Sequence, residues 1–325
     1  MVLLLLGVLV LYFWEEDHSR VPQGGTGPKE ELTYFNGTWY RPRKDVEAVL
    51  LMGIDKAALD ERLLVQGEYE QSDFLLLLVI DRKAMTCTGI HINRDTMAEI
   101  QILTDSGRLE GTFTGQITLA HSYGGSSEIR CRNAVDAVSK LMYGIQIDKY
   151  ISIAMDGIPV LNDLVGGVTV EVMDDLTGMD STLVQGKTVT LKGMQALTYV
   201  RARKGLADPT NTHRMERQKQ YLDALQKKLL ELGMMDEGFA LSTVMELNDY
   251  LVSNCSVEQL SDLADILEEC GEVQYRTLAG ESVLEDEYYE FRVDEDALQR
   301  TVMELFYERA ETAQSRFQRA GSLNE

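Results

Sequence analysis

Apolar and polar residues alternate along most of the chain with two different periods. Runs of apolar and β-branched residues that are typical of strands occupy 46–54, 74–80, 86–92, 150–154 and 168–172, with shorter runs near 273–278 and 288–293. Apolar residues at helical spacing occupy 128–143, 192–199, 212–232, 256–269 and 294–310. This alternation predicts a layered α/β fold. Because no Pro/Gly-rich segment interrupts 46–310, we expect one domain there.

The N-terminal region has a different pattern. Residues 2–14 form an uninterrupted apolar run, which as a helix would span about 20 Å of a membrane core that is roughly 30 Å thick. Aromatic residues end the run, as at a membrane interface, and a Gly/Pro-rich segment follows. We interpret 1–17 as part of an N-terminal membrane anchor, 18–45 as a linker and 311–325 as a polar tail. The domain would then lie on the outer face of the membrane; a buried core helix is the alternative for the apolar run.

Composition and charge narrow the classes of function. The chain has 31 Lys and Arg residues against 53 Asp and Glu residues, a net charge of −22. This excess of negative charge argues against a nucleic-acid partner, whose phosphates require basic residues. Six basic residues nevertheless gather between 201 and 219. The four cysteines have no metal-binding spacing; Cys255 and Cys270 flank a predicted helix, and they either form a disulfide or remain free thiols.

Charged side chains gather at the ends of three predicted strands. Asp55 ends the first strand, Asp73 precedes the second, and Arg94 with Asp95 follows the third. A fourth group surrounds the start of the long predicted helix and comprises Arg201, Arg203, Arg214, Arg217 and Gln218. Taken singly, such residues are usually turn residues, structural ion pairs or a solvated helix face. Together they predict a ligand site, because ligands tend to bind at strand ends of α/β sheets.

These residue types suit a phosphate ligand. The planar guanidinium of arginine matches the oxygens of phosphate, so several arginines can hold a pyrophosphate. Mg²⁺ typically takes one or two carboxylates and completes its shell with water and phosphate oxygens, and Asp55 and Asp73 could supply the two carboxylates. The chain has no P-loop, no kinase glycine-rich loop and no Gly-x-Ser-x-Gly elbow. The residues therefore favour a phosphate site of another kind.

The order of these groups resembles the LytR-CpsA-Psr family of cell-envelope proteins. The motifs that carry the resemblance are collinear and read Gly53–Asp55, Ser72–Asp73, Arg94–Thr96, Tyr123–Gly125, Gly166–Val170, Gln195–Arg203 and Arg214–Gln218. The resemblance implies an α-β-α layered domain over 46–310, with a central mixed sheet and an apolar tunnel for a prenyl chain. The apolar faces of 128–143 and 212–232 are candidates for lining that tunnel, although core packing would give the same pattern.

The resemblance also implies an activity. Such proteins are Mg²⁺-dependent phosphotransferases that move an anionic glycopolymer, teichoic acid or capsular polysaccharide, from a polyprenyl-pyrophosphate carrier to peptidoglycan outside the cell membrane. The family pattern places Mg²⁺ on Asp55 and Asp73. It places the catalytic and pyrophosphate-binding side chains at Arg94, Asp95, Arg201, Arg203 and Arg214, with Arg217 and Gln218 in the last motif. Asp95 is either a general base or one half of an ion pair with Arg94.

The chain departs from the family pattern at several positions. Family members often carry Arg where this chain has Gln71 and Lys56, and Pro where it has Asn93. The two missing arginines suggest weaker pyrophosphate binding or a different carrier or acceptor, whereas both metal carboxylates are present. An alternative function is therefore a membrane-anchored protein that binds polyprenyl phosphates or glycans without turnover. A transcriptional attenuator is disfavoured because the chain is acidic and has no extended basic surface.

Overall fold

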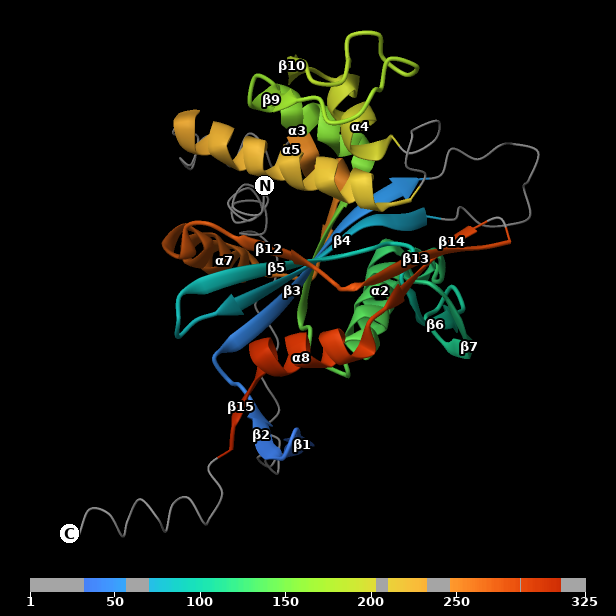
Figure 1. Cartoon of the computed structure of the whole chain (residues 1–325), viewed down its shortest axis with the longest axis vertical. Coiled ribbons are helices and arrows are strands. Elements are labelled where there is room, and N and C mark those ends of the chain that lie inside the picture. The colour runs from blue at the N-terminus through green and yellow to red at the C-terminus, as the bar shows by residue number, and fades with distance from the viewer. Residues whose placement is uncertain (1–31, 57–69, 203–209, 233–245, 287, 311–325) are drawn as a thin grey trace, which may run out of the picture.

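A six-stranded mixed sheet forms the centre of the molecule. The computed structural model describes residues 32–56, 70–202, 210–232, 246–286 and 288–310 (Figure 1). The sheet order is β11 (Leu251–Ser253), β8 (Lys149–Ala154), β3 (Val46–Lys56), β4 (Glu70–Asp81), β5 (Thr86–Ile92) and β12 (Gln274–Thr277). The β3–β4 and β4–β5 pairs are antiparallel, whereas β8 and β12 run parallel to β3 and β5. Residues 75–80 are buried on both faces of β4, which explains why this strand is almost entirely apolar.

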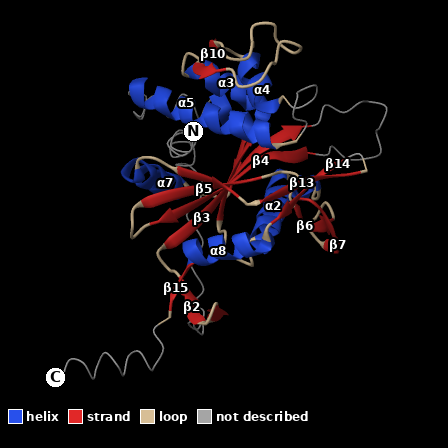
Figure 2. Ribbon diagram, viewed as in Figure 1, coloured by secondary structure: helices blue, strands red, loops and turns tan. Residues whose placement is uncertain are grey.

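Helices cover both faces of this sheet (Figure 2). One apolar core contains residues of α3 (Ile158–Leu164), α4 (Met194–Arg201), α5 (Thr212–Leu232) and α7 (Val257–Cys270). A second core contains residues of α2 (Ser127–Leu141) and α8 (Glu295–Phe306). Alternate residues of β3 and β4 belong to the two cores, so the cores lie on opposite faces of the sheet. The α-β-α layered fold with a central mixed sheet is thereby confirmed.

The two helices that were candidate walls of one tunnel are separated by the sheet. The buried side chains of α2 belong to one core, and those of α5 belong to the other. A tunnel on one face can therefore use only one of these two helices. The apolar spacing of the other helix then reflects packing in the core, as the sequence allowed for both helices.

Shorter paired strands surround the central layers. The pairs are β6 (Met97–Leu103) with β7 (Leu109–Gln116), β9 (Val168–Glu171) with β10 (Thr188–Leu191), and β13 (Gly280–Glu285) with β14 (Tyr288–Val293). A three-stranded sheet joins β1 (Thr33–Phe35), β2 (Thr38–Pro42) and β15 (Tyr307–Arg309). Because β1 and β2 fall within 18–45, part of the segment expected to be a linker is paired with the end of the domain.

Some expectations fall on residues that the structure does not describe. The apolar run of the expected anchor and the tail 311–325 lie outside the described residues. Among the described helices, none combines the length and the apolar character that crossing a membrane requires. Cys255 and Cys270 are both free thiols. Cys270 lies beside Cys87 on β5, where burial, with a hydrogen bond to Cys270, raises the pKa of the Cys87 thiol.

Candidate functional site

A bulge between β3 and β4 shapes the edge of the sheet where the two predicted metal carboxylates lie. Gly53 pairs with Phe74 and Ile54 pairs with Ser72, so Asp73 is an extra residue on β4. In a regular strand, Asp73 would share a face with Leu75, on the side away from α5. Its carboxylate instead contacts α5. The bulge therefore turns Asp73 toward the face of the sheet that carries the basic residues.

Three arginines bind these two carboxylates. Arg94, which follows β5, and Arg214, on the first turn of α5, both contact Asp73; the Arg214 Nη1 to Asp73 Oδ2 distance is 2.9 Å. Arg201, at the end of α4, places Nη2 2.7 Å and Nε 2.9 Å from Asp55 Oδ2. Arg214 and Asp73 are buried, whereas the Arg201 side chain is 40% exposed. The structure thus brings together five of the predicted residues from β3, β4, β5, α4 and α5.

Arg217 is directed away from this group. Its side chain is fully buried, and its guanidinium donates to the carbonyl oxygens of Tyr199 (2.9 Å) and Ala202 and pairs with Asp174. Two guanidinium nitrogens therefore hold the end of α4, and the third holds Asp174, which follows β9. This geometry supports a structural role for Arg217 in place of the expected pyrophosphate contact.

The other predicted residues have different surroundings. Gln218 is buried and donates from Nε2 to the carbonyl oxygen of Val200 at 3.2 Å. Asp95 is also buried; its Oδ1 lies 3.6 Å from Arg94 Nε and accepts from Gln116 Nε2 at 3.3 Å. These contacts match the ion-pair alternative for Asp95. Arg203 lies outside the described residues.

Three amide side chains outside the predicted set complete the site. Gln71 Oε1 accepts from Arg94 Nη2 at 2.5 Å, and Asn211 Oδ1 accepts from Arg214 Nε at 2.7 Å. Asn93 bonds in turn to Asn211. Gln71 and Asn93 did stand out as departures from the family pattern, but their partners are remote in sequence.

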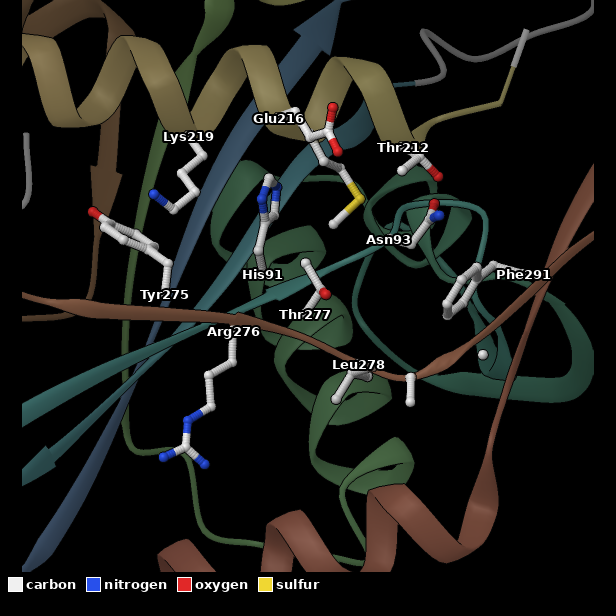
Figure 3. A pocket seen from close by; sticks show the side chains of 13 residues that line it. His91, Asn93, Thr212, Glu216, Lys219, Tyr275, Arg276, Thr277, Leu278 and Phe291 are labelled. Carbon is white, nitrogen blue, oxygen red and sulfur yellow. The ribbon is translucent and has the colours of Figure 1, made fainter. Parts of the chain in front are cut away.

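A cavity of about 450 Å³ adjoins the site between α5 and β12 (Figure 3). Its walls include Asn93, Met215, Lys219 and Tyr275, and the Lys219 ammonium lies 5.3 Å from the centre of the Tyr275 ring. The His91 side chain points from β5 toward α5 at the base of this cavity. Burial, with a smaller contribution from the Arg214 charge, lowers the pKa of His91 to about 3. His91 is therefore neutral at physiological pH.

A smaller apolar cavity, of about 40 Å³, begins next to the charged groups. Its lining includes Gly53, Phe74 and Val200, which lie two residues or fewer from Asp55, Asp73 and Arg201 in sequence, together with Ile158, Tyr221 and Leu222. The cavity lies on the α5 face of the sheet. The site thus combines charged groups with an adjoining apolar space on one face.

Asp55 and Asp73 also determine whether a cation fits here. Within the described ranges, no group of three or more His, Cys, Asp or Glu side chains is arranged to hold a metal alone. Mg²⁺ does not require a group of three protein side chains, because it typically takes one or two protein carboxylates and keeps water or phosphate oxygens as its other ligands. Two carboxylates from neighbouring strands beside three phosphate-matching arginines fit that requirement, with the remaining ligands supplied by substrate and water.

Comparison with known proteins identifies the family of the chain. The family described as "LytR_cpsA_psr family" matches residues 22–306, which is most of the chain. The chain belongs to this family. This LytR-CpsA-Psr protein is 30% identical over 268 residues to polyisoprenyl-teichoic acid–peptidoglycan teichoic acid transferase TagU of Enterococcus faecalis, covering 81% of this chain and 79% of that protein.

Solved structures show the same fold. This family member superposes on protein gbs0355 from Streptococcus agalactiae with a TM-score of 0.63 at 22% identity, covering 82% of this chain and 90% of that one. It superposes on a structure described as "TagT bound to LI-WTA" with a TM-score of 0.57 at 24% identity, covering 81% and 90%. At these identities the superpositions establish the architecture of this LytR-CpsA-Psr protein.

Proposed function

We propose that this protein is a Mg²⁺-dependent phosphotransferase that moves an anionic glycopolymer from a polyprenyl-pyrophosphate carrier to peptidoglycan. The observation that carries the proposal is the convergence of Arg94, Arg201 and Arg214 with Asp55 and Asp73 at one edge of the sheet. Family membership and the similarity to a named teichoic acid transferase support the same reaction class. Teichoic acid is the favoured polymer, and capsular polysaccharide is the other.

The arginines are suited to the pyrophosphate group of the carrier. Guanidinium groups bind phosphate oxygens in a bidentate manner and stabilise negative charge on a transferring phosphoryl group. Arg201 is the most exposed of the three, so it is best placed to meet the incoming ligand. Arg94 and Arg214 are held at depth by Asp73, which fixes their orientation before the substrate binds.

Charge balance supports a requirement for a cation. The side chains of Asp55, Asp73 and Asp95 formally neutralise those of Arg94, Arg201 and Arg214, so these six groups alone present no excess of positive charge to a pyrophosphate. Asp55 and Asp73 would hold Mg²⁺. When bound, the ion supplies charge neutralisation for the phosphate oxygens and for the leaving group.

The polyprenyl chain requires an apolar surface next to the phosphates. The small cavity that begins at Gly53, Phe74 and Val200 supports this assignment, because it lies on the α5 face of the sheet. Widening it by movement of α5 over the sheet would lengthen the apolar space. Only α5, and not α2, would then form a wall of the lipid tunnel. The carrier is a membrane lipid, so we place the protein at the outer face of the cell membrane.

Turnover by purified protein tests the proposal. We expect the full chain with Mg²⁺ to transfer the disaccharide 1-phosphate from a synthetic polyprenyl-pyrophosphate disaccharide to a peptidoglycan fragment and to release polyprenyl monophosphate, and we expect EDTA to stop the reaction. Asp73→Asn and Arg94→Ala should lower turnover by roughly 100-fold or more, as loss of a transition-state contact does. Arg82→Ala is the control, since Arg82 binds Glu47 and Asp262 at the other end of β4. Tight carrier binding with no turnover would support the binding-protein alternative, and EDTA-insensitive turnover would exclude the metal.

A further inference from the structure

Three neutral amide side chains form hydrogen bonds to or next to Arg94 and Arg214 in the site. Gln71 binds Arg94, and Asn211 binds Arg214. Asn211 Nδ2 also donates to Asn93 Oδ1 at 3.0 Å. These contacts come from β4, from the end of β5 and from the residue before α5, so they join the strand that carries Asp73 to the two segments that carry Arg94 and Arg214. We call Gln71, Asn93 and Asn211 the amide frame.

The hydrogen-bond pattern fixes how the two asparagines are oriented. Asn93 Oδ1 accepts from the backbone N–H of Asp95 at 3.0 Å, and a backbone N–H can only donate. The Asn93 atom in that position is therefore the oxygen, and Asn211 must present its NH₂ group to it. The Asn211 oxygen then faces Arg214 Nε, which is also an obligate donor. Asn93 and Asn211 are 4% and 1% exposed, so water does not offer competing partners.

Amide oxygens affect an arginine differently from carboxylates. Either acceptor fixes the direction of an N–H bond, but a carboxylate also brings a full negative charge within a few ångströms of the guanidinium. That charge would oppose the approach of a phosphate to the same arginine. Asp73 already supplies one carboxylate that Arg94 and Arg214 share. Two further carboxylates at the positions of Gln71 and Asn211 would lower the positive potential of the site.

We propose that the amide frame positions Arg94 and Arg214 for an anionic phosphate ligand while adding no negative charge to the site. Its members are positioning residues: they act through the two arginines. The proposal rests on the proposed function and assigns a role to three side chains of its site. Gln71, at the start of β4, holds Arg94 directly, whereas Asn93 reaches Arg214 through Asn211. Gln71 thus supplies a neutral acceptor that orients an arginine of the site.

Gln71→Glu is the decisive variant, because it keeps the acceptor oxygen and changes only the charge. The probes are inorganic pyrophosphate and geranylgeranyl pyrophosphate with MgCl₂, titrated into the full chain by calorimetry. We expect Kd for both probes to rise roughly tenfold. The melting temperature should hold or increase, because a hydrogen bond between charged groups is stronger than a neutral one. Asn254→Asp is the matched control, since Asn254 Oδ1 accepts from the backbone N–H of Tyr150 near the opposite end of the sheet.

Asn211→Leu tests orientation without a change of charge. We expect a lower kcat with a smaller change in KM, because Arg214 would lose its tether at Nε while it keeps Asp73. If this variant fails to fold, Gln71→Glu still decides. Wild-type affinity in a folded Gln71→Glu protein would overturn the inference alone. Absence of pyrophosphate binding by the wild-type chain would overturn the proposed function and this inference together.

Discussion

Replacing Arg217 by Met should lower the free energy of unfolding of the protein and leave its ligand site intact. The Arg217 side chain is fully buried, and its loss would leave the carbonyl oxygens of Tyr199 and Ala202 without this donor and Asp174 without this cation. Breaking a buried ion pair from one side typically costs about 3–5 kcal/mol. Asp174 also accepts from His213 Nδ1 at 3.0 Å and is 13% exposed, so partial compensation is available. We therefore expect a loss of about 3 kcal/mol in the free energy of unfolding.

Urea denaturation measures the expected loss of stability, and calorimetry measures the expected retention of ligand affinity. The urea midpoint should fall with little change in slope, and the melting temperature should drop by roughly 6–12 °C for a domain of this size. Affinity for inorganic pyrophosphate with Mg²⁺, measured well below the transition, should stay within about threefold of wild type, since a threefold change is less than 1 kcal/mol. Lys219→Met is the control: Lys219 forms an exposed ion pair with Asp223, which is worth at most about 1 kcal/mol.

The opposite result would refute this interpretation of Arg217. An unchanged urea midpoint together with tenfold weaker pyrophosphate binding would mean that Arg217 binds ligand, as its position in the Arg214–Gln218 motif led us to expect. It would also mean that the contacts to the end of α4 are dispensable.

Two further predictions concern stability. His91 has a pKa lowered to about 3 in the folded protein, against 6.5 ordinarily, so the unfolded chain binds a proton that the folded chain does not. The free energy of unfolding should therefore fall as the pH drops below 6.5, by about 2 kcal/mol at pH 5; urea titrations of His91→Leu should lack this component, and an identical pH profile would contradict it. Gly167→Ala should destabilise more than Gly166→Ala in thermal melts. Both glycines have positive φ, but only at Gly167 would a Cβ lie 2.7 Å from the Leu191 carbonyl oxygen; equal melting temperatures would contradict this steric argument.

The main layers of the fold could be predicted from the sequence because their signals are local. The apolar run of β4 and the helical spacing of α2 and α5 follow from burial on two faces or on one. The β6–β7 and β1–β2 pairs were not predicted. Much of β1, β2 and β7 is exposed or half-buried, so these strands carry little apolar alternation. Their pairing is determined by the partner strand.

The candidate site could be predicted by residue type but not by geometry. The positions of Asp55, Asp73 and Arg94 at strand ends were sufficient to group them, because strand ends meet at a common edge. The bulge that turns Asp73 toward α5 depends on the register between two strands, which the sequence does not state. Arg214 and Arg217 are three residues apart on one helix, and only the packing of α4 against α5 shows that the second binds the end of α4.

The net charge of −22 is compatible with the proposed anionic ligand, because the charges next to the ligand affect its binding more than the distant surface charges do. Screening by salt limits the influence of exposed charges to about 10 Å, whereas buried groups interact with much less screening. Asp73 and Arg214 are both buried, so their interaction depends little on the acidic surface. Asp73 stabilises Arg214, which would otherwise be costly to bury, and Asp55 holds the more exposed Arg201 in place. A cation on Asp55 and Asp73 would weaken those ion pairs and leave the arginines more positive toward phosphate. The carboxylates thus keep the arginines in place in the free protein and would become metal ligands when substrate and cation bind together.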